Sequence, residues 1–347
     1  MSFASQLQSI LQKLLINDAD RAPYTADAIS ICNELMDDLK KEDDHFRKAF
    51  DGLSLSGSYL DRVKLKTPDE FDMHLKLKLP FQVTPVRDSQ RSGFVFLRYT
   101  GGSHPAVVDG YVNRKSLQDW IRNAFHKVFE SYNQIKKGGE TYKLTYTLQG
   151  HGCSHTIEAQ SPSKFISFDF VPVFEFTHSQ WPLPDPASVS HNVRQNWNWF
   201  AVPQQKRPAD DRTFMVCAPH WEREMMKGNY NLKNILRLMK GMRDKHIREM
   251  PHLSSYMLKT VILLQLEKRP DTYWQKDLAT LFVDMWTRLV QHFRDNNLPF
   301  FLAHDCNHFD RLKRDDFLKC KETAEILYHK INLTRNESKF YLDQLFF

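Results

Sequence analysis

The sequence lacks any apolar run long enough to cross a bilayer, and it contains few cysteines. None of its stretches approaches the roughly 18 to 20 consecutive apolar residues that a membrane span needs. Its first residues do not show the charged-then-apolar pattern of a signal peptide. The five cysteines are scattered and include no Cys-x-x-Cys pair, which is typical of a reducing compartment. We therefore expect a cytoplasmic protein without a membrane partner.

The residues that are abundant indicate a globular protein with a large core. Of the 347 residues, 41% are hydrophobic and 13% aromatic, which excludes a disordered chain. A chain of this length has room for one body with two lobes. The formal net charge of +6 permits a polyanionic partner without requiring one.

Hydrophobic periodicity predicts an α+β fold in which a mixed first part precedes a helical second part. We expect a core lobe over 1–215, with a twisted sheet and a long N-terminal spine helix, and a helical lobe over 216–347. Pro23 should separate a first helix from the spine helix, and Thr25 should be the N-cap of the latter. The helices are expected at 3–16, 25–49, 116–134, 219–227, 231–249, 254–267, 275–296, 310–330 and 335–345. The clearest strands are expected at 70–79, 141–148, 153–159 and 165–176, and an irregular crossing at 178–219.

Two acidic residues lie two positions apart on the first of these strands. From Glu70 the even positions are polar and the odd positions apolar, so Glu70 and Asp72 point to the same face. Both carboxylates could bind one hard cation such as Mg²⁺, which prefers one or two carboxylates plus phosphate oxygens. Spacing alone fits equally a half-buried strand that carries two acids on its wet face.

Two further features add to this pair. Asp169 lies in the middle of an apolar strand, where a charge needs a partner or a metal ion. Gly57 and Ser58 precede the acids at an expected turn, where glycine permits close backbone approach and serine can donate to phosphate oxygens. Three acids behind a Gly-Ser turn are the set that two-metal phosphoryl transfer requires.

With these motifs, the sequence resembles cyclic GMP-AMP synthase (cGAS) and the animal cGAS-like receptors. The resemblance extends over nearly the whole chain and includes the Gly57-Ser58 and Glu70-x-Asp72 elements, the third acid and a later Ser-Tyr pair. It implies that Glu70, Asp72 and Asp169 are catalytic and hold Mg²⁺ or Mn²⁺. It also implies ATP and GTP as substrates.

The resemblance assigns three more residues to the nucleotide pocket. Lys240 would contact the triphosphate, Ser255 a phosphate or ribose, and Tyr256 would stack on a base. Without the resemblance, Ser255 and Tyr256 would read as a helix N-terminus beside a packed aromatic ring, and Lys240 as a solvated lysine.

The sequence departs from cGAS in two places. Met215 and Cys217 stand where the base-recognition strand of cGAS has an arginine and a serine, so the choice of base is open. The link at 227–231 is short and has no Cys or His, so the zinc ribbon of cGAS is expected to be missing. Two His-x-Cys-x-His runs, at 151–155 and 304–308, have metal-ligand spacing, but a chain with 15 histidines produces such runs by chance, and we expect no structural zinc.

The resemblance further implies that a nucleic acid activates the protein. One arrangement that it allows is a dimer of the protein bound to that nucleic acid. Double-stranded RNA is favoured over DNA, because A-form RNA is recognised by shape through phosphates and 2′-hydroxyls, which needs no DNA-specific insert. Each basic residue proposed for this groove fits equally a solvated surface charge. They are Lys40, Lys41, Arg47, Lys48, Lys233, Arg237, Arg243 and Lys245.

The leading hypothesis is thus an innate immune nucleotidyltransferase that makes a cyclic dinucleotide of the cyclic GMP-AMP type. Two alternatives remain open. One is a transferase that makes linear oligonucleotides, and the other is a non-catalytic relative that serves as a binding or scaffold protein.

Overall fold

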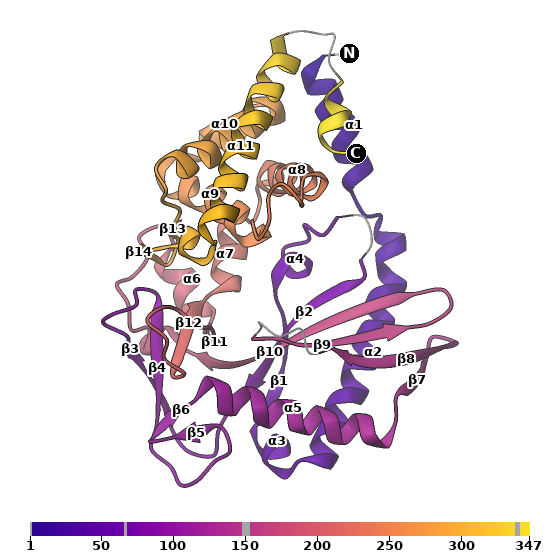
Figure 1. The fold of residues 1–347 in the computed structure, drawn as a ribbon, viewed down its shortest axis with the longest axis vertical. Coiled ribbons are helices and arrows are strands. Elements are labelled where there is room, and N and C mark those ends of the chain that lie inside the picture. Colours follow the sequence, from indigo (N-terminus) through magenta and orange to yellow (C-terminus); the bar gives the residue numbers. More distant parts are fainter. Residues whose placement is uncertain (1, 66–67, 148–152, 337–340) are drawn as a thin grey trace.

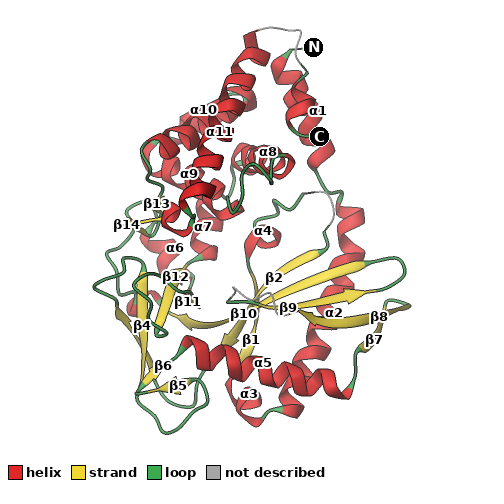
Figure 2. Ribbon diagram, viewed as in Figure 1, coloured by secondary structure: helices red, strands yellow, loops and turns green. Residues whose placement is uncertain are grey.

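The computed structural model describes residues 2–65, 68–147, 153–336 and 341–347. The fold is α+β and has two halves, a sheet-containing half and a helical half (Figure 1). A long helix and a second, transverse helix cover the sheet, and the remaining long helices gather in the other half (Figure 2). The expected fold class is therefore confirmed. The lobe boundary expected at 215/216 remains a prediction.

Helices occur along the whole chain. They are α1 (Phe3–Leu14), α2 (Asp18–Glu42), α3 (Asp44–Ala49), α4 (Gly57–Leu60), α5 (Arg114–Ser131), α6 (His191–Asn196), α7 (Pro219–Met225), α8 (Tyr230–Lys245), α9 (Ser255–Lys268), α10 (Leu278–Arg294), α11 (Arg314–Asn336) and the 3₁₀ turns η1 (His178–Gln180), η2 (Asp271–Gln275), η3 (His308–Arg311) and η4 (Leu342–Leu345).

The strands form one large sheet and a small hairpin. They are β1 (Phe50–Leu55), β2 (Glu70–Leu77), β3 (Val83–Arg87), β4 (Phe94–Tyr99), β5 (Val107–Val108), β6 (Tyr111–Val112), β7 (Gln134–Lys137), β8 (Glu140–Thr147), β9 (His155–Gln160), β10 (Phe165–Phe176), β11 (Trp199–Pro203), β12 (Thr213–Cys217) and, in the hairpin, β13 (Pro299–Phe300) and β14 (Ala303–Asn307).

The long strand β10 is the hub of the large sheet. It pairs in antiparallel fashion with β9 and β11 and in parallel with β2, which in turn pairs with β1. Its alternating phenylalanines explain this position, because Phe168 and Phe170 are fully buried while Asp169 between them is only half-buried. The expectation of a strand at 165–176 is confirmed at both ends.

The spine helix begins earlier than the sequence suggested. Asn17, not Thr25, is the N-cap, since its side chain accepts a hydrogen bond from the N–H of Ala19 at 3.0 Å. Pro23 lies inside α2, where it removes one backbone donor without ending the helix. Thr25 instead donates its hydroxyl to the carbonyl of Arg21. The expectations of a break at Pro23 and of a cap at Thr25 were therefore wrong.

Two other expected helices also differ. The run at 25–49 is two helices, because Asp43 ends α2 and caps α3 by accepting from the N–H of Phe46 at 2.8 Å. A separate helix at 335–345 is not found in the described part, where α11 continues to Asn336 and Leu342–Leu345 is one 3₁₀ turn.

The region 178–219, expected to be irregular, contributes β11 and β12 to the sheet.

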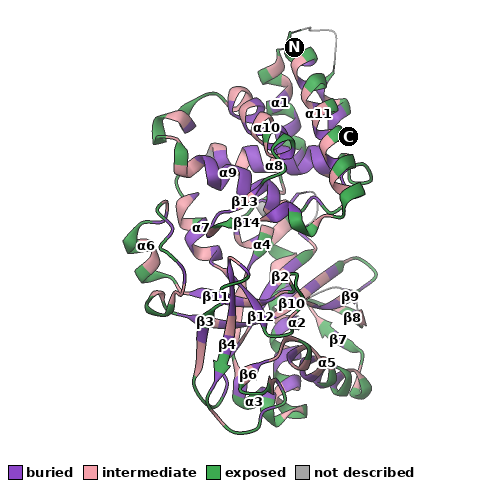
Figure 3. Cartoon of the chain, turned by 60° about the vertical axis from the view of Figure 1, so that its left-hand side comes forward, coloured by how far each residue is buried: buried purple, intermediate pink, exposed green. Residues whose placement is uncertain are grey.

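The first helix packs with the helical half, although the chain then enters the spine helix. Leu14 is buried against α8 at Gly241, where an added Cβ would stand 2.7 Å from Leu14 Cδ1. Lys13 Nζ pairs with Asp343 at 2.5 Å, so α1 also contacts the last turn of the chain. The view coloured by burial shows buried residues where α1, α8 and α10 meet (Figure 3).

Among the described residues, no helix combines the length and the apolar character that a membrane crossing requires.

Candidate active site

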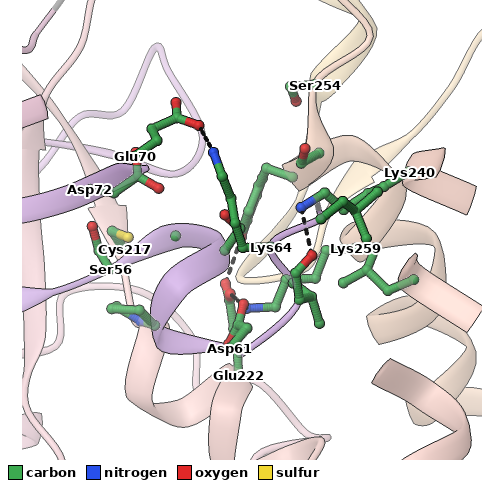
Figure 4. Close-up of a pocket in the computed structure, with 18 of the residues that line it drawn as sticks. Ser56, Asp61, Lys64, Glu70, Asp72, Cys217, Glu222, Lys240, Ser254 and Lys259 are labelled. Atoms are coloured by element: carbon green, nitrogen blue, oxygen red, sulfur yellow. Dashed lines mark hydrogen bonds and ion pairs between the residues drawn. The ribbon is translucent and has the colours of Figure 1, made fainter. Parts of the chain in front are cut away.

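The three acids come together where β2 and β10 run side by side. The parallel register sets Asp169 opposite Asp72 and Ser167 opposite Glu70, so the three carboxylates share one face. One ligand oxygen from each lies within 4.8 Å of the others. Figure 4 shows Glu70 and Asp72 at the edge of the cavity. Two residues of one strand and one of its neighbour are thus enough to build the cluster.

The environment of the cluster opposes negative charge. Burial raises the pKa of Asp72 to about 6, and repulsion by Glu70 and Asp169 adds to this. The pKa of Asp169 is also raised, mainly by burial, although Thr156 offsets part of the effect by donating its hydroxyl to Oδ1 at 2.5 Å. A bound cation would relieve this repulsion.

A cationic side chain already partly compensates the cluster. Lys64 Nζ forms an ion pair with Glu70 and stands 3.8 Å from Asp69 Oδ1. Three carboxylates, of which Asp72 and Asp169 have raised pKa values, together with an ammonium group paired to Glu70, are a donor set that fits Mg²⁺ or Mn²⁺. The residues present therefore fit the metal ions that the sequence suggested.

Gly57 and Ser58 form the start of the short helix α4, directly against Asp72. Gly57 has φ +59°, and a Cβ added there would stand 1.9 Å from Asp72 Oδ2, so no larger residue fits without displacement. Hydrogen bonding by the backbone of Ser58 offsets part of the rise in the pKa of Asp72. The sequence predicted a turn here, and the structure shows a helical turn that touches the acids.

A cavity of about 600 Å³ opens in front of these groups. Its walls come from both halves of the molecule, with β2 and α4 on one side and α7, α8 and α9 on the other. This volume lies within the range of about 300 to 1,000 Å³ that is usual for small-molecule sites.

The three residues assigned to the nucleotide pocket all line this cavity. Lys240 is 5% exposed, and burial lowers its pKa to about 8. Its Nζ donates to the carbonyl of Val63 at 2.9 Å, which leaves two of three ammonium donors available. Ser255 is the first residue of α9, beside the capping residue Ser254. Tyr256 donates its hydroxyl to Glu222 Oε1 at 2.6 Å.

Arg243 is placed differently from its expected position in a nucleic-acid groove. It is 7% exposed and lines the cavity, and its guanidinium donates to Ser255 Oγ at 2.9 Å and to the carbonyl of Leu253. A buried guanidinium cannot bind a large polyanion at the surface. The contacts of Arg243 thus lie inside the cavity wall, at Ser255 and Leu253.

The other basic residues do not form one cluster. Those at the end of α2 and in α3 and those on α8 lie in opposite halves of the molecule (Figure 1). Lys40, Lys41 and Arg47 pair with acids one turn earlier, at 3.0, 2.8 and 2.7 Å. Lys48 and Lys245 are exposed, while Lys233 and Arg237 are half-buried.

Sequence reasoning missed a buried charge network at the base of the cavity. Lys259 Nζ pairs with Asp61 Oδ2 at 2.6 Å and with Glu222 Oε2 at 2.8 Å (Figure 4). Burial lowers the pKa of Lys259, but the two carboxylates outweigh burial and hold the pKa above its ordinary value. The sequence did contain one indication of this network. Lys259 follows Ser255 by one helical turn, which places both side chains on the same face of α9.

The sequence also singled out Met215 and Cys217 and two His-x-Cys-x-His runs. Cys217 lines the cavity, and Met215 is buried in the same strand. Cys306 and His308 are buried, whereas His304 is exposed and pairs with Glu267 at 3.1 Å, so this run does not converge on one point. The other His-x-Cys-x-His run begins at His151, outside the described residues.

α7 and α8 are joined directly by residues 226–229, so the described chain has no insert at the place of the zinc ribbon.

Comparisons with known proteins agree with this architecture. The Mab-21 protein nucleotidyltransferase domain matches residues 59–228, and the Mab-21 protein HhH/H2TH-like domain matches residues 231–325. A cyclic GMP-AMP synthase-like protein of Drosophila melanogaster is 52% identical over 100% of this chain and 99% of its own length. A cyclic GMP-AMP synthase-like receptor of Drosophila eugracilis is 35% identical over 91% of this chain and 87% of its own. The chain therefore belongs to the Mab-21-type nucleotidyltransferases of the cyclic GMP-AMP synthase-like family.

Proposed function

We propose that this nucleotidyltransferase joins two nucleoside triphosphates, ATP and GTP, into a cyclic dinucleotide when double-stranded RNA binds to it. The observation that carries the proposal is the cluster of Glu70, Asp72 and Asp169, with ligand oxygens within 4.8 Å, at the mouth of a nucleotide-sized cavity. The names of its relatives, cyclic GMP-AMP synthase-like receptors, support a sensor that makes such a product.

In this proposal, one wall of the cavity binds the metal ions and phosphates, and the opposite wall binds the rest of the nucleotide. Held by the three carboxylates, Mg²⁺ or Mn²⁺ would supply Lewis acidity for the attacking ribose hydroxyl and the leaving pyrophosphate. Ser58 and the backbone N–H groups of α4 would hold the phosphates in line with that hydroxyl.

The opposite wall would fix the rest of the nucleotide. The free donors of Lys240 face the cavity and suit triphosphate oxygens, and Ser255 at the start of α9 adds a hydroxyl near a helix N-terminus. The ring of Tyr256 packs edge-on against His308 at 5.4 Å, and its hydroxyl bond to Glu222 restricts its rotation. A ring held in this way offers a fixed surface for a base.

The activating partner is inferred from the connection between α7 and α8 and from the basic residues of α8. The direct connection from α7 to α8 carries no insert in the described chain, and a duplex recognised by shape needs none. If the exposed Lys245 and the half-buried Lys233 contact phosphates, affinity must fall steeply as salt rises. A flat response to salt would remove the nucleic acid from the proposal and leave another trigger.

The test is a product assay. The protein is incubated with labelled ATP and GTP, Mg²⁺ or Mn²⁺, and double-stranded RNA or DNA, and the products are separated by chromatography. We expect a cyclic product with RNA and at least a hundredfold less with Asp169→Asn, given the usual weight of electrostatic terms. Asp51→Asn, an exposed acid on β1, is the matched control.

Other outcomes would decide between the alternatives. A linear product would replace cyclisation with oligonucleotide synthesis. Equal activity of Asp169→Asn would refute the assigned mechanism, and no product with any nucleic acid would favour a binding or scaffold role.

A further inference from the structure

Three cationic side chains of the helical half bind three consecutive residues of the other half. Lys259 Nζ pairs with the Asp61 carboxylate at 2.6 Å, and Lys240 Nζ donates to the carbonyl of Val63 at 2.9 Å. Between them, the guanidinium of Arg237 donates to the carbonyl of Arg62 at 2.6 Å. We call Arg237, Lys240 and Lys259 the three-cation clasp.

The bound segment lies between the two parts of the site that face phosphate and metal. Residues 61–63 directly follow α4, which carries Gly57 and Ser58, and directly precede Lys64, which pairs with Glu70. Any movement of this segment therefore moves both the phosphate-binding turn and the ammonium group at the acids. The clasp reaches it from α8 and α9, more than 170 residues later in the chain.

The backbone of the segment needs such support. Arg62 has φ +57°, the left-handed region, although it carries a side chain. A non-glycine residue in this region is strained and persists only where its surroundings hold it. The Arg62 side chain is exposed. The backbone N–H groups of residues 61–63 bond to carbonyls of α4, and the contacts from the helical half are those of the clasp with the carbonyl of Arg62 and with Asp61 and Val63.

The clasp is also mostly sealed from water. Lys240, Lys259 and Asp61 are 5%, 6% and 5% exposed, and Lys259 is compensated on its far side by Glu222, 2% exposed. Charge-assisted hydrogen bonds in such surroundings are stronger than in water and have definite geometry. Surface ion pairs, such as Lys41 with Asp38, have neither property.

We propose that the three-cation clasp consists of positioning residues that hold the Gly57–Leu60 helix against the acid cluster by fixing residues 61–63 from the helical half. The catalytic geometry of the sheet half is then set by the helical half. The effect on catalysis rests on the proposed function, but the positioning itself does not, and it has its own readout.

The test measures amide hydrogen exchange of the segment that contains α4 and residues 61–64. Arg237→Met removes one clasp member that is not buried, and Asp61→Asn removes the charge that Lys259 binds while Lys259 keeps Glu222. We expect exchange in this segment to rise about tenfold in each variant, as expected when about 1.4 kcal/mol of local stabilisation is lost. Arg237→Lys, which keeps a donor, should restore much of the protection.

A matched control separates positioning from general loss of stability. Asp88→Asn removes the partner of Arg91 in a buried ion pair outside the site, at 2.6 Å. It should lower the melting temperature and leave exchange at 57–64 as in the unmodified chain. If Asp61→Asn and Arg237→Met leave that exchange unchanged, or raise exchange equally in every peptide, the clasp does not position α4.

Activity of the same variants distinguishes this proposal from the proposed function. If the unmodified protein transfers nucleotides, both clasp variants should lower kcat more than they raise KM, because alignment rather than affinity is lost. If the unmodified protein has no transferase activity but the variants show the expected exchange pattern, the clasp proposal stands and the proposed function is refuted.

Discussion

At the scale of single residues, position 57 tolerates only a hydrogen atom as its side chain. Gly57→Ala would place a Cβ 1.9 Å from Asp72 Oδ2, so either the carboxylate or the start of α4 must move. We expect loss of most metal binding and activity, and a stability cost of about 1 to 3 kcal/mol from clash and positive φ together. Calorimetric titration with Mn²⁺ and chemical denaturation measure the two effects.

A second glycine supplies the control for that clash. Gly139 has φ +80° and nothing within 4 Å of an added Cβ. Gly139→Ala therefore carries the backbone strain without the collision. If both variants lose metal binding equally, strain rather than contact with Asp72 explains the requirement.

If Asp72 is a metal ligand, as proposed, metal binding must depend on pH. Its pKa near 6 in the metal-free protein means that a proton must leave before the carboxylate can bind a cation below that pH. The stabilisation by Mn²⁺, measured as a shift in melting temperature, should therefore be large at about pH 7.5 and much smaller at about pH 5.

In the metal-free protein, the contribution of Asp72 to stability should change with pH in the opposite direction. Because burial raises the folded-state pKa of Asp72 above its usual value, the folded state binds more protons, and this group's contribution to stability falls as pH rises from about 4 to 6. Asp72→Asn should remove that contribution.

For the metal-bound protein, a Mn²⁺-induced shift in melting temperature of equal size at both pH values would contradict the assignment of Asp72 as a ligand.

At the scale of elements, strong periodicity made β2 and β10 predictable, and with them the acid cluster. Alternation over 165–176 fixed both ends of β10, and the same period placed Glu70 and Asp72 on one face. Periodicity did not detect the strands β11 and β12, because each has only five residues and lies among prolines, although the resemblance placed Met215 and Cys217 on a strand. Their identity as strands depends on pairing with β10 and β4, which no local pattern contains.

The start of α2 shows how a local signal can be outweighed. Pro23 and Thr25 looked like a boundary, yet the capping bond of Asn17 comes first, and the helix passes through the proline. Asn17→Ala should lower the free energy of unfolding by about 1 kcal/mol, whereas Asn17→Ser, which keeps an acceptor, should cost much less. Chemical denaturation of the two variants measures this; equal losses would mean that Asn17 is not the cap.

At the scale of the whole molecule, the helix that opens the chain stabilises the half that closes it. Leu14 is 1% exposed and packs on α8, whereas its neighbour Leu15 is 37% exposed. Leu14→Ala should cost about 2 to 5 kcal/mol of folding free energy. Leu15→Ala should stay within about 0.5 kcal/mol, as is usual on surfaces. Similar melting temperatures for both variants would show that α1 is not part of the helical core.

The long-range contacts of the site could not be predicted, because, like the packing of α1 on α8, they join segments far apart in the sequence. The acids are two residues apart or on neighbouring strands, so their grouping follows from strand geometry. Asp61 and Lys259 are 198 residues apart, and nothing in either segment alone indicates that they meet. The sequence indicated the three acids and, through the resemblance, Lys240, Ser255 and Tyr256 on the opposite wall, whereas the contacts of that wall with residues 61–63 became visible only in three dimensions.

The buried Lys240 has a consequence for chemical labelling. With a pKa of about 8, a larger share of this amine is unprotonated at neutral pH than of an ordinary lysine, near 10.5, and the neutral form is the nucleophile. An acylating reagent small enough to enter the cavity would therefore modify Lys240 faster than a solvated amine such as that of Lys48. A nucleotide bound in the cavity would shield it, so mass spectrometry of the modified peptide would report occupancy of the site without any turnover.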